Sequence, residues 1–243
     1  MKYPIGIQNF EDLRLNNYIY IDKTKYIYKL ANEGKYYFLS RPRRFGKSLL
    51  ISTIEAYFQG KRELFDGLAI QQEEKEWNSY PILHIDLNTA NFREEDSLYT
   101  LLNDYLCQWE SVYGTRESET TLALRFKGIV ARIAQKEGKG VVILIDEYDK
   151  PILQTLQHPE LQDKHRNILK AFYSVLKTQD KYIKFAFITG VTKFGKVSVF
   201  SDLNNLTDIS MDNRYVAICG LTEEELASNF KQGIEELAKT YGD

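Results

Sequence analysis

The chain has 243 residues, of which 43% are hydrophobic and 27% charged, a composition typical of soluble globular proteins. The formal net charge of −2 gives no overall indication of nucleic-acid binding. No apolar segment is long enough to span a membrane and the N-terminus does not resemble a secretory signal, so we expect a cytoplasmic protein without a membrane partner. The length suits a single domain over residues 1–243, with a core at about 18–220 and a terminal helix at 221–243.

The N-terminal part of the chain predicts a helix followed by a short strand. Asp22 or Thr24 is suited to cap a helix that runs through Asn32 and ends at Gly34. Residues 36–39 are all apolar and predict a buried strand. We therefore expect a strand to enter the sheet early in the chain.

A basic turn and a Gly-Lys-Ser sequence follow this strand. Residues 41–48 match the phosphate-loop pattern G-x-x-x-x-G-K-S except that Arg41 replaces the first glycine. Helix N-termini bind anions through backbone N–H groups, so Gly46 would admit a phosphate and Lys47 would pair with the β and γ phosphates. Ser48 would ligate a Mg²⁺ that bridges these phosphates. The sequence thus predicts a nucleotide site, with an ordinary strand–turn–helix junction as the alternative.

The other residues of this loop complete the predicted nucleotide-binding set. Leu49 would supply a further backbone N–H near the α-phosphate, and Phe45 lies beside the glycine. Arg43 and Arg44 could contact phosphates, but a solvated basic turn would explain them equally well. We include all four in the predicted site.

Two apolar segments later in the chain end in acidic residues. Residues 81–85 precede Asp86, and the aliphatic run 141–145 precedes Asp146 and Glu147. An apolar run without alternation is typical of a parallel strand buried on both faces, and its acids would emerge where α/β sheets bind ligands. We expect Asp146 to hold Mg²⁺ through water and Glu147 to deprotonate an attacking water. A helix N-cap pair is the alternative explanation.

The remaining segments predict further helices and strands. Apolar residues recur at helical spacing in three segments, namely 97–112, 121–136 and 159–178. Two more strands are expected at residues 184–190 and 214–219, with a loop or lid at 191–213 between them. Thr189, at the exit of the first of these strands, could sense the γ-phosphate or position the water, or form a purely structural hydrogen bond. Strands that alternate with helices predict a three-layer α/β fold with a parallel sheet.

The C-terminal residues predict one last helix. Thr222 and Glu225 form a capping-box pattern, and apolar residues follow at helical spacing, namely Leu226, Phe230, Ile234, Leu237 and Tyr241. We expect this apolar face to pack on the core of the protein. The alternative is a docking surface for a segment outside this sequence.

Several residues that could carry chemistry have simpler explanations. We expect Cys107 and Cys219 to be buried reduced thiols, because their spacing fits neither a metal site nor a redox pair. Asp149 and Lys150 are expected to form an ion pair at a helix start. The histidines show no metal-ligand spacing and are assigned structural roles, namely His84, His158 and His165.

Four segments together resemble the AAA-ATPase-like family of bacterial and archaeal proteins, namely residues 20–24, 38–49, 145–151 and 188–191. The likeness extends from about residue 3 to residue 226, and Arg-Pro-Arg-Arg is the usual form of the loop in that family. The resemblance implies a P-loop ATPase of the additional-strand, catalytic-glutamate class, with the strand of Asp146 beside the strand of Thr189. It also implies that members often continue into a C-terminal domain similar to restriction nucleases, and no such sequence follows Leu221 here.

The function we favour from the sequence is hydrolysis of Mg-ATP that drives a conformational change. The alternatives are a nucleotide-dependent switch or scaffold with little turnover and, less favoured, a small-molecule kinase. No arginine follows Arg214, so an arginine finger would come from Arg214, from the phosphate loop or from another subunit. We therefore expect slow hydrolysis by the isolated chain, and a second copy or a C-terminal effector domain as partner.

Overall fold

The structure is a computed structural model that describes residues 2–193, 199–201 and 203–241. Its centre is a parallel sheet with the strand order β2-β3-β4-β1-β5 among the described residues. The strands span the following residues: β1 Tyr36–Ser40, β2 Ile82–Asp86, β3 Val141–Asp146, β4 Ile183–Gly190 and β5 Thr207–Asp208. The expected α/β fold with a parallel sheet is confirmed.

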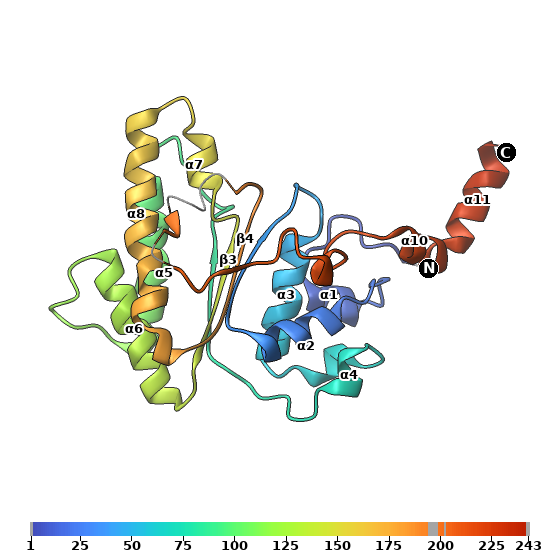
Figure 1. Cartoon of the computed structure of the whole chain (residues 1–243), viewed down its shortest axis with the longest axis horizontal. Coiled ribbons are helices and arrows are strands. Elements are labelled where there is room, and N and C mark those ends of the chain that lie inside the picture. The colour runs from blue at the N-terminus through green and yellow to red at the C-terminus, as the bar shows by residue number, and fades with distance from the viewer. Residues whose placement is uncertain (1, 194–198, 202, 242–243) are drawn as a thin grey trace.

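Helices cover both faces of this sheet, which makes the three expected layers (Figure 1). One face carries α5 (Ser97–Tyr113), α6 (Leu122–Glu137) and α8 (Pro159–Thr178). The other carries α1 (Phe10–Leu15), α2 (Thr24–Glu33) and α3 (Lys47–Phe58). The remaining helices are η1 Arg62–Phe65, α4 Ile70–Glu73, α7 Lys150–Gln154, η2 Asp180–Tyr182, η3 Asn213–Tyr215, α10 Glu223–Asn229 and α11 Lys231–Tyr241.

The composition of β3 follows from its position inside the sheet. Val141, Ile143 and Ile145 pack into the core beneath α5, α6 and α8, whereas Val142 and Leu144 pack into the core on the α3 side. Because successive side chains of a strand point to opposite faces, a strand covered on both sides needs apolar residues at every position. This burial explains why the segment shows no polar alternation.

The parallel arrangement brings the carboxyl ends of the strands to one edge of the sheet. β4 lies between β1 and β3, and Leu39 is the register partner of Thr189. On the other side of β3, Asp86 pairs in register with Asp146. The acids of β2 and β3 and the residues that follow β1 therefore meet at the same edge, where open α/β sheets bind ligands.

The prediction of a strand at residues 214–219 is wrong. This segment forms η3 and a turn, and its buried residues Tyr215, Ile218 and Cys219 are three and four positions apart, the spacing of a helical turn rather than of a strand. The strand beside β1 is instead β5, which pairs Thr207 with Tyr37 and Asp208 with Phe38. It falls inside the expected loop at 191–213, part of which lies outside the described residues.

The C-terminal helix also differs from expectation. The capping box is present, because Thr222 Oγ1 accepts from Glu225 N at 3.1 Å and Glu225 Oε2 accepts from Thr222 N at 2.9 Å. The helix breaks at Phe230, and α11 extends away from the body of the molecule (Figure 1). Leu226, Ile234 and Leu237 are 44%, 46% and 64% exposed, so the expected packing of this face on the core is wrong.

Of the two thiols expected to be buried, only that of Cys219 is buried. Cys107 is exposed because α5 buries the stripe Leu98, Leu102 and Leu106, and the next residue along the helix turns away from that stripe.

Candidate nucleotide-binding site

The turn between β1 and α3 is shaped by left-handed backbone conformations. Gly46, the N-cap of α3, has φ +85°, a value that favours glycine because other side chains meet their own backbone there. Nothing lies within 4 Å of the position that a Cβ would take, so its conformation rather than lack of space requires the glycine. Arg44 is also left-handed, with φ +67°. The loop therefore curls over the first turn of α3.

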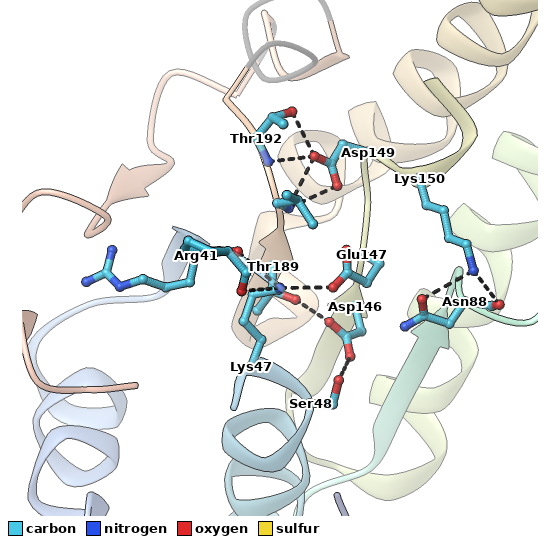
Figure 2. A network of polar contacts seen from close by, with 12 residues as sticks. Arg41, Lys47, Ser48, Asn88, Asp146, Glu147, Asp149, Lys150, Thr189 and Thr192 are labelled. Atoms are coloured by element: carbon cyan, nitrogen blue, oxygen red, sulfur yellow. Dashed lines mark hydrogen bonds and ion pairs between the residues drawn. The ribbon is translucent and has the colours of Figure 1, made fainter. Parts of the chain in front are cut away.

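The ammonium of Lys47 lies beneath this loop and is only 4% exposed. It forms an ion pair with Glu147, with 3.0 Å between Nζ and Oε1, and donates to the carbonyl oxygens of Arg41 at 3.1 Å and Pro42 at 3.3 Å (Figure 2). Lys47 thus links the loop to the end of β3. A buried cation at the N-terminus of a helix is well placed to attract an anion.

Asp146 joins three elements through two short hydrogen bonds (Figure 2). Ser48 Oγ, at the start of α3, donates to Asp146 Oδ2 at 2.6 Å. Thr189 Oγ1, near the end of β4, donates to Asp146 Oδ1 at 2.5 Å. The sequence-predicted residues Ser48, Asp146 and Thr189 therefore meet at one carboxylate, and the hydroxyl of Thr189 is satisfied by it.

Glu147 lies directly after β3 in a left-handed conformation, with φ +54°. For a residue other than glycine, such a conformation costs about 1–3 kcal/mol and is found most often at functional sites. Burial raises the pKa of the Glu147 carboxyl, although the nearby Lys47 ammonium acts to lower it. Neither Glu147 nor Asp146 caps α7, whose N-cap is Asp149, so the alternative explanation as a cap pair is not supported.

The prediction of an ion pair between Asp149 and Lys150 is wrong. Asp149 is 1% exposed. Its carboxylate accepts hydrogen bonds from Thr192 N at 2.7 Å, from Thr192 Oγ1 at 2.8 Å and from Val191 N at 3.2 Å. Lys150 Nζ donates instead to the backbone oxygen of Asn88 at 2.6 Å (Figure 2). The backbone N–H groups that follow β4 donate hydrogen bonds to the Asp149 carboxylate, because a buried charge requires nearby donors.

Arg41 replaces the first glycine of the loop pattern, and its side chain points away from Lys47 (Figure 2). Arg41 Nη1 donates to the carbonyl of Ser210 at 2.5 Å and to that of Ser40 at 3.1 Å. Ser210 lies just after β5, and its Oγ also accepts from Ser40 N at 2.9 Å. Arg41 therefore ties the loop to the edge strand and is not positioned to bind phosphate in this conformation.

A cleft of about 1070 Å³ lies in front of Lys47 and Glu147. One wall is formed by the loop and by the first turn of α3, including the predicted residues Arg43, Arg44, Gly46, Ser48 and Leu49. The opposite walls contain residues that the sequence did not lead us to include, namely Ile5, Gly6, Ile7, Gln8, Asp86, Asn88, Lys150, Leu153 and Gln154. Asp86 had a sequence signal, since it ends an apolar strand, and Lys150 lies in the family-like segment 145–151. The N-terminal wall comes from distant residues that no motif marks.

A second, smaller pocket of about 330 Å³ adjoins this cleft. It shares Arg44, Gly46 and Leu49 with the cleft, and it also contains the predicted residue Phe45. Its other lining residues are Pro4, Leu13, Ile19, Tyr20, Ile21, Lys23, Leu50, Thr53, Ile218, Cys219, Gly220, Leu221 and Phe230. No sequence motif predicted this pocket, because its walls come from parts of the chain that only folding brings together.

Other candidate groups lie away from the cleft. Arg214 is exposed and pairs with Asp212, with 2.6 Å between Nη2 and Oδ2, and its Nη1 lies 4.0 Å from Glu33 Oε2. Glu33 precedes β1 whereas the phosphate loop follows it, so Arg214 lies toward the opposite end of that strand from Lys47. His84 pairs with Glu55, and His165 contacts the carbonyl oxygen of Phe92. Within the described part of the chain, no histidine, cysteine or acidic residues group into a metal cluster.

Comparison with known proteins gives the class of this protein. The family model of the AAA-ATPase-like proteins, described as predicted AAA-ATPase, matches residues 4–200. The chain belongs to this family, as the sequence motifs indicated, and membership supports binding of ATP by a P-loop.

A curated relative extends the comparison without adding a function. A protein of Azotobacter chroococcum mcd 1, described as "Uncharacterized protein in vnfD 5'region", is 41% identical over 230 residues. The match covers 94% of this chain and 45% of the relative, so the chain spans a little less than half of that protein's length. No solved structure matches the chain. Among the helices formed by the described residues, none combines the length and apolar character needed to cross a membrane.

Proposed function

We propose that the chain is a P-loop ATPase of the additional-strand, catalytic-glutamate class that hydrolyses Mg-ATP to drive a conformational change. The observation that carries this proposal is the convergence of Lys47, Ser48, Asp146 and Glu147 at one edge of the sheet, beside a large cleft. The position of β4 between the strand of the loop and the strand of Asp146 supports the assignment to that class.

The phosphates would bind at the N-terminus of α3. Gly46 leaves open space above the first turn of the helix, and Lys47 and the backbone N–H groups of Ser48 and Leu49 supply positive potential. The buried Lys47 ammonium now pairs with Glu147. A triphosphate would compete for this ammonium, and binding would therefore release the Glu147 carboxylate.

The oxygen donors of Ser48 and Asp146 fit a magnesium ion. Magnesium is bound in such sites by one or two protein oxygen groups together with phosphate oxygens and water, and a hydroxyl and a carboxylate lie together here. When bound, the ion would neutralise charge that develops on the phosphates. Thr189 holds the other oxygen of Asp146 and would act as a positioning residue through it.

Glu147 would act as the general base. It lines the cleft, where a water can reach its carboxylate, and burial raises its pKa, which makes it a better proton acceptor than an ordinary glutamate. The same ion pair with Lys47 favours the alternative function, a nucleotide-dependent switch with little turnover, if nucleotide fails to separate the two side chains.

Replacement of Glu147 tests this proposal and separates the two functions. Glu147→Gln should retain Mg-ATP binding and lose about 10²–10⁴-fold in turnover, because the amide keeps the shape and cannot accept the proton. The protonated form of Glu147 cannot act as a base, so turnover should fall as the pH is lowered. Because the pKa of Glu147 is raised above its ordinary value, this fall should begin at a higher pH than for an ordinary glutamate.

The measurements are phosphate release across a pH series and binding calorimetry at each pH. The calorimetry shows how affinity depends on pH, so that changes in turnover can be separated from changes in binding. Equal turnover by Glu147→Gln and wild type would exclude Glu147 as the base. Tight binding with no phosphate release by the wild type would favour the switch.

A further inference from the structure

We propose that a surface at the amino ends of the strands, opposite the cleft, binds single-stranded nucleic acid. We call it the lysine–tyrosine surface, and it consists of Lys136, Lys139, Lys181, Lys184, Tyr80 and Tyr182. It is separate from the nucleotide site, because α6 leads into β3 and η2 into β4 at the end of the sheet that lies away from the phosphate loop (Figure 1).

The lysines converge from two segments that are distant in the chain. The first segment is the end of α6 and the turn after it, with Lys136 and Lys139, and the second is η2 and the start of β4, with Lys181 and Lys184. Gly140 packs directly against Lys184, because a Cβ on this glycine would lie 3.0 Å from Lys184 Cβ. Hydrogen bonds from Lys181 and from Gln135 of α6 lower the pKa of Tyr182. The two segments therefore form one surface.

Tyrosine rings lie between the ammonium groups of this surface. Lys139 Nζ and Lys184 Nζ are 5.7 and 5.6 Å from the centroid of the Tyr80 ring. Lys181 Nζ is 4.6 Å from the centroid of the Tyr182 ring. Both tyrosines are only partly buried. Cations and aromatic rings thus alternate along the surface.

The charge of these lysines is not neutralised by ion pairs. All four are exposed, and none pairs with an acidic residue in the part of the chain that the structure describes. Asp180, beside Lys181, is already paired with Lys35 at 2.9 Å. Four ammonium groups therefore face one carboxylate within the surface, that of Glu137. The net charge of −2 for the whole chain conceals this local excess, which attracts phosphates.

The alternation of cations and rings favours a single strand over other polyanions. Ammonium groups bind the phosphates of a single strand, and its bases stack on aromatic faces with little regard to sequence. A base that takes the place of an ammonium above a ring leaves that ammonium free to bind a phosphate. A duplex keeps its base faces inside its own stack. An anionic membrane binds best where Phe, Leu or Trp accompany the lysines, and the six side chains include none of these.

The charge reverses at one border of the surface, and this limits the path of the strand. Tyr80 and Lys184 also line a neighbouring pocket of about 340 Å³. The acidic residues of that pocket are Glu73, Glu74 and Glu76. Because these carboxylates repel phosphates, the strand should run from Tyr80 toward Lys181 and the end of α6.

Fluorescence anisotropy with the full chain and a labelled oligothymidylate of about 15 nucleotides tests the proposal. Each neutralised phosphate of a single strand adds about −0.7 to the slope of log affinity against log salt. Four lysines therefore predict a slope of about −3 and a loss of affinity of about 50-fold between about 50 and 200 mM salt. The double variant Lys139→Ala, Lys181→Ala should show a slope of about −1.4 and bind roughly 60-fold more weakly at about 50 mM salt.

A second pair of variants separates stacking from charge. Tyr182→Leu should weaken binding roughly 5- to 150-fold without changing the salt slope, because it removes one stacked base and no cation. Tyr182→Phe should retain most of the affinity, since phenylalanine still offers a ring. Lys25→Ala is the matched control, because Lys25 is also exposed above a tyrosine ring, 5.1 Å from the centroid of Tyr26, but lies outside the surface. It should leave affinity and slope unchanged. Thermal unfolding by circular dichroism checks that each variant folds.

Comparison of ligands decides the kind of partner. Oligothymidylate and oligouridylate should both bind, and the tighter of the two indicates whether the strand is DNA or RNA. A duplex bound as tightly as the single strand, with no loss for Tyr182→Leu, would overturn the proposal. Wild-type affinity of the double lysine variant would also overturn it, as would binding to phosphatidylserine vesicles without binding to either oligonucleotide.

Discussion

At the scale of single residues, the site is organised by one cation and one carboxylate. Lys47 contacts Glu147 and two carbonyl oxygens of the loop, and Asp146 accepts from Ser48 and Thr189. Both groups are almost fully buried, and a buried charge is stable only where such partners surround it. Arg41, which breaks the glycine pattern, serves a different purpose, since it ties the loop to Ser210.

Removal of the Lys47 ammonium should weaken nucleotide binding directly. A charge-assisted hydrogen bond contributes about 1.5–3 kcal/mol, so Lys47→Ala should bind Mg-ATP roughly 10- to 150-fold more weakly in calorimetry. Lys150→Ala is the control, because this second ammonium of the cleft is held by Asn88 and not by the loop. Affinity of Lys47→Ala equal to that of wild type would show that the phosphates bind elsewhere.

At the scale of secondary-structure elements, the site depends on how the exits of β3 and β4 are held together. Tyr148 N donates to the carbonyl of Thr189 at 2.9 Å, and Asp149 accepts from the backbone after Gly190. A Cβ on Gly190 would lie 2.5 Å from the ring of Tyr148, so only glycine allows this approach. These bonds keep Glu147 beside Asp146 and in front of the loop.

Asp149→Ala should destabilise the protein through this junction. The change leaves the backbone N–H groups of Val191 and Thr192 without their acceptor, and each buried unpaired donor costs about 1–3 kcal/mol. The free energy of unfolding in urea should fall by about 2–4 kcal/mol. Lys150→Ala, at the next position, loses an exposed hydrogen bond and should cost less than about 1 kcal/mol. Equal losses for the two variants would show that Asp149 does not hold the junction.

At the scale of the whole molecule, the arginines that line the cleft among the described residues are Arg43 and Arg44. Arg43 and Arg44 come from the loop itself, and Arg214 lies beside Glu33 toward the other end of β1. Arg214 is 58% exposed and pairs with the adjacent Asp212 at 2.6 Å, so its guanidinium faces solvent rather than its own site. We therefore propose that an arginine finger, if used, is supplied by a second copy of the chain.

Turnover per chain should then rise with protein concentration. An arginine finger contributes about 10³–10⁵ in rate, so its arrival from a neighbour should outweigh other effects. Arg214→Ala should abolish the rise in phosphate release, and Arg116→Ala, which removes another exposed arginine, should not. Fast hydrolysis at high dilution that is unaffected by Arg214→Ala would mean that one chain contains a complete site.

The local sequence determined most of the helices and strands and indicated residues of the candidate site. The 3.6-residue spacing marked α5, α6 and α8, and the aliphatic run marked β3, because burial on one or both faces leaves a periodic imprint on the sequence. Gly46, Lys47 and Ser48 were predictable from the phosphate-loop pattern, and Asp146 and Glu147 because they end an aliphatic run. The structure brings these residues together.

Only the tertiary structure decided which surfaces meet. The edge strand β5 is two residues long and held by Tyr37 and Phe38, too short for any pattern. The partners of Asp149, the direction of Arg41 and the pocket next to the loop all involve residues distant in the chain, whose contacts no local spacing records. The exposed face of α11 has the same amphipathic pattern as a buried helix, because periodicity shows that a helix has an apolar face and not what covers it.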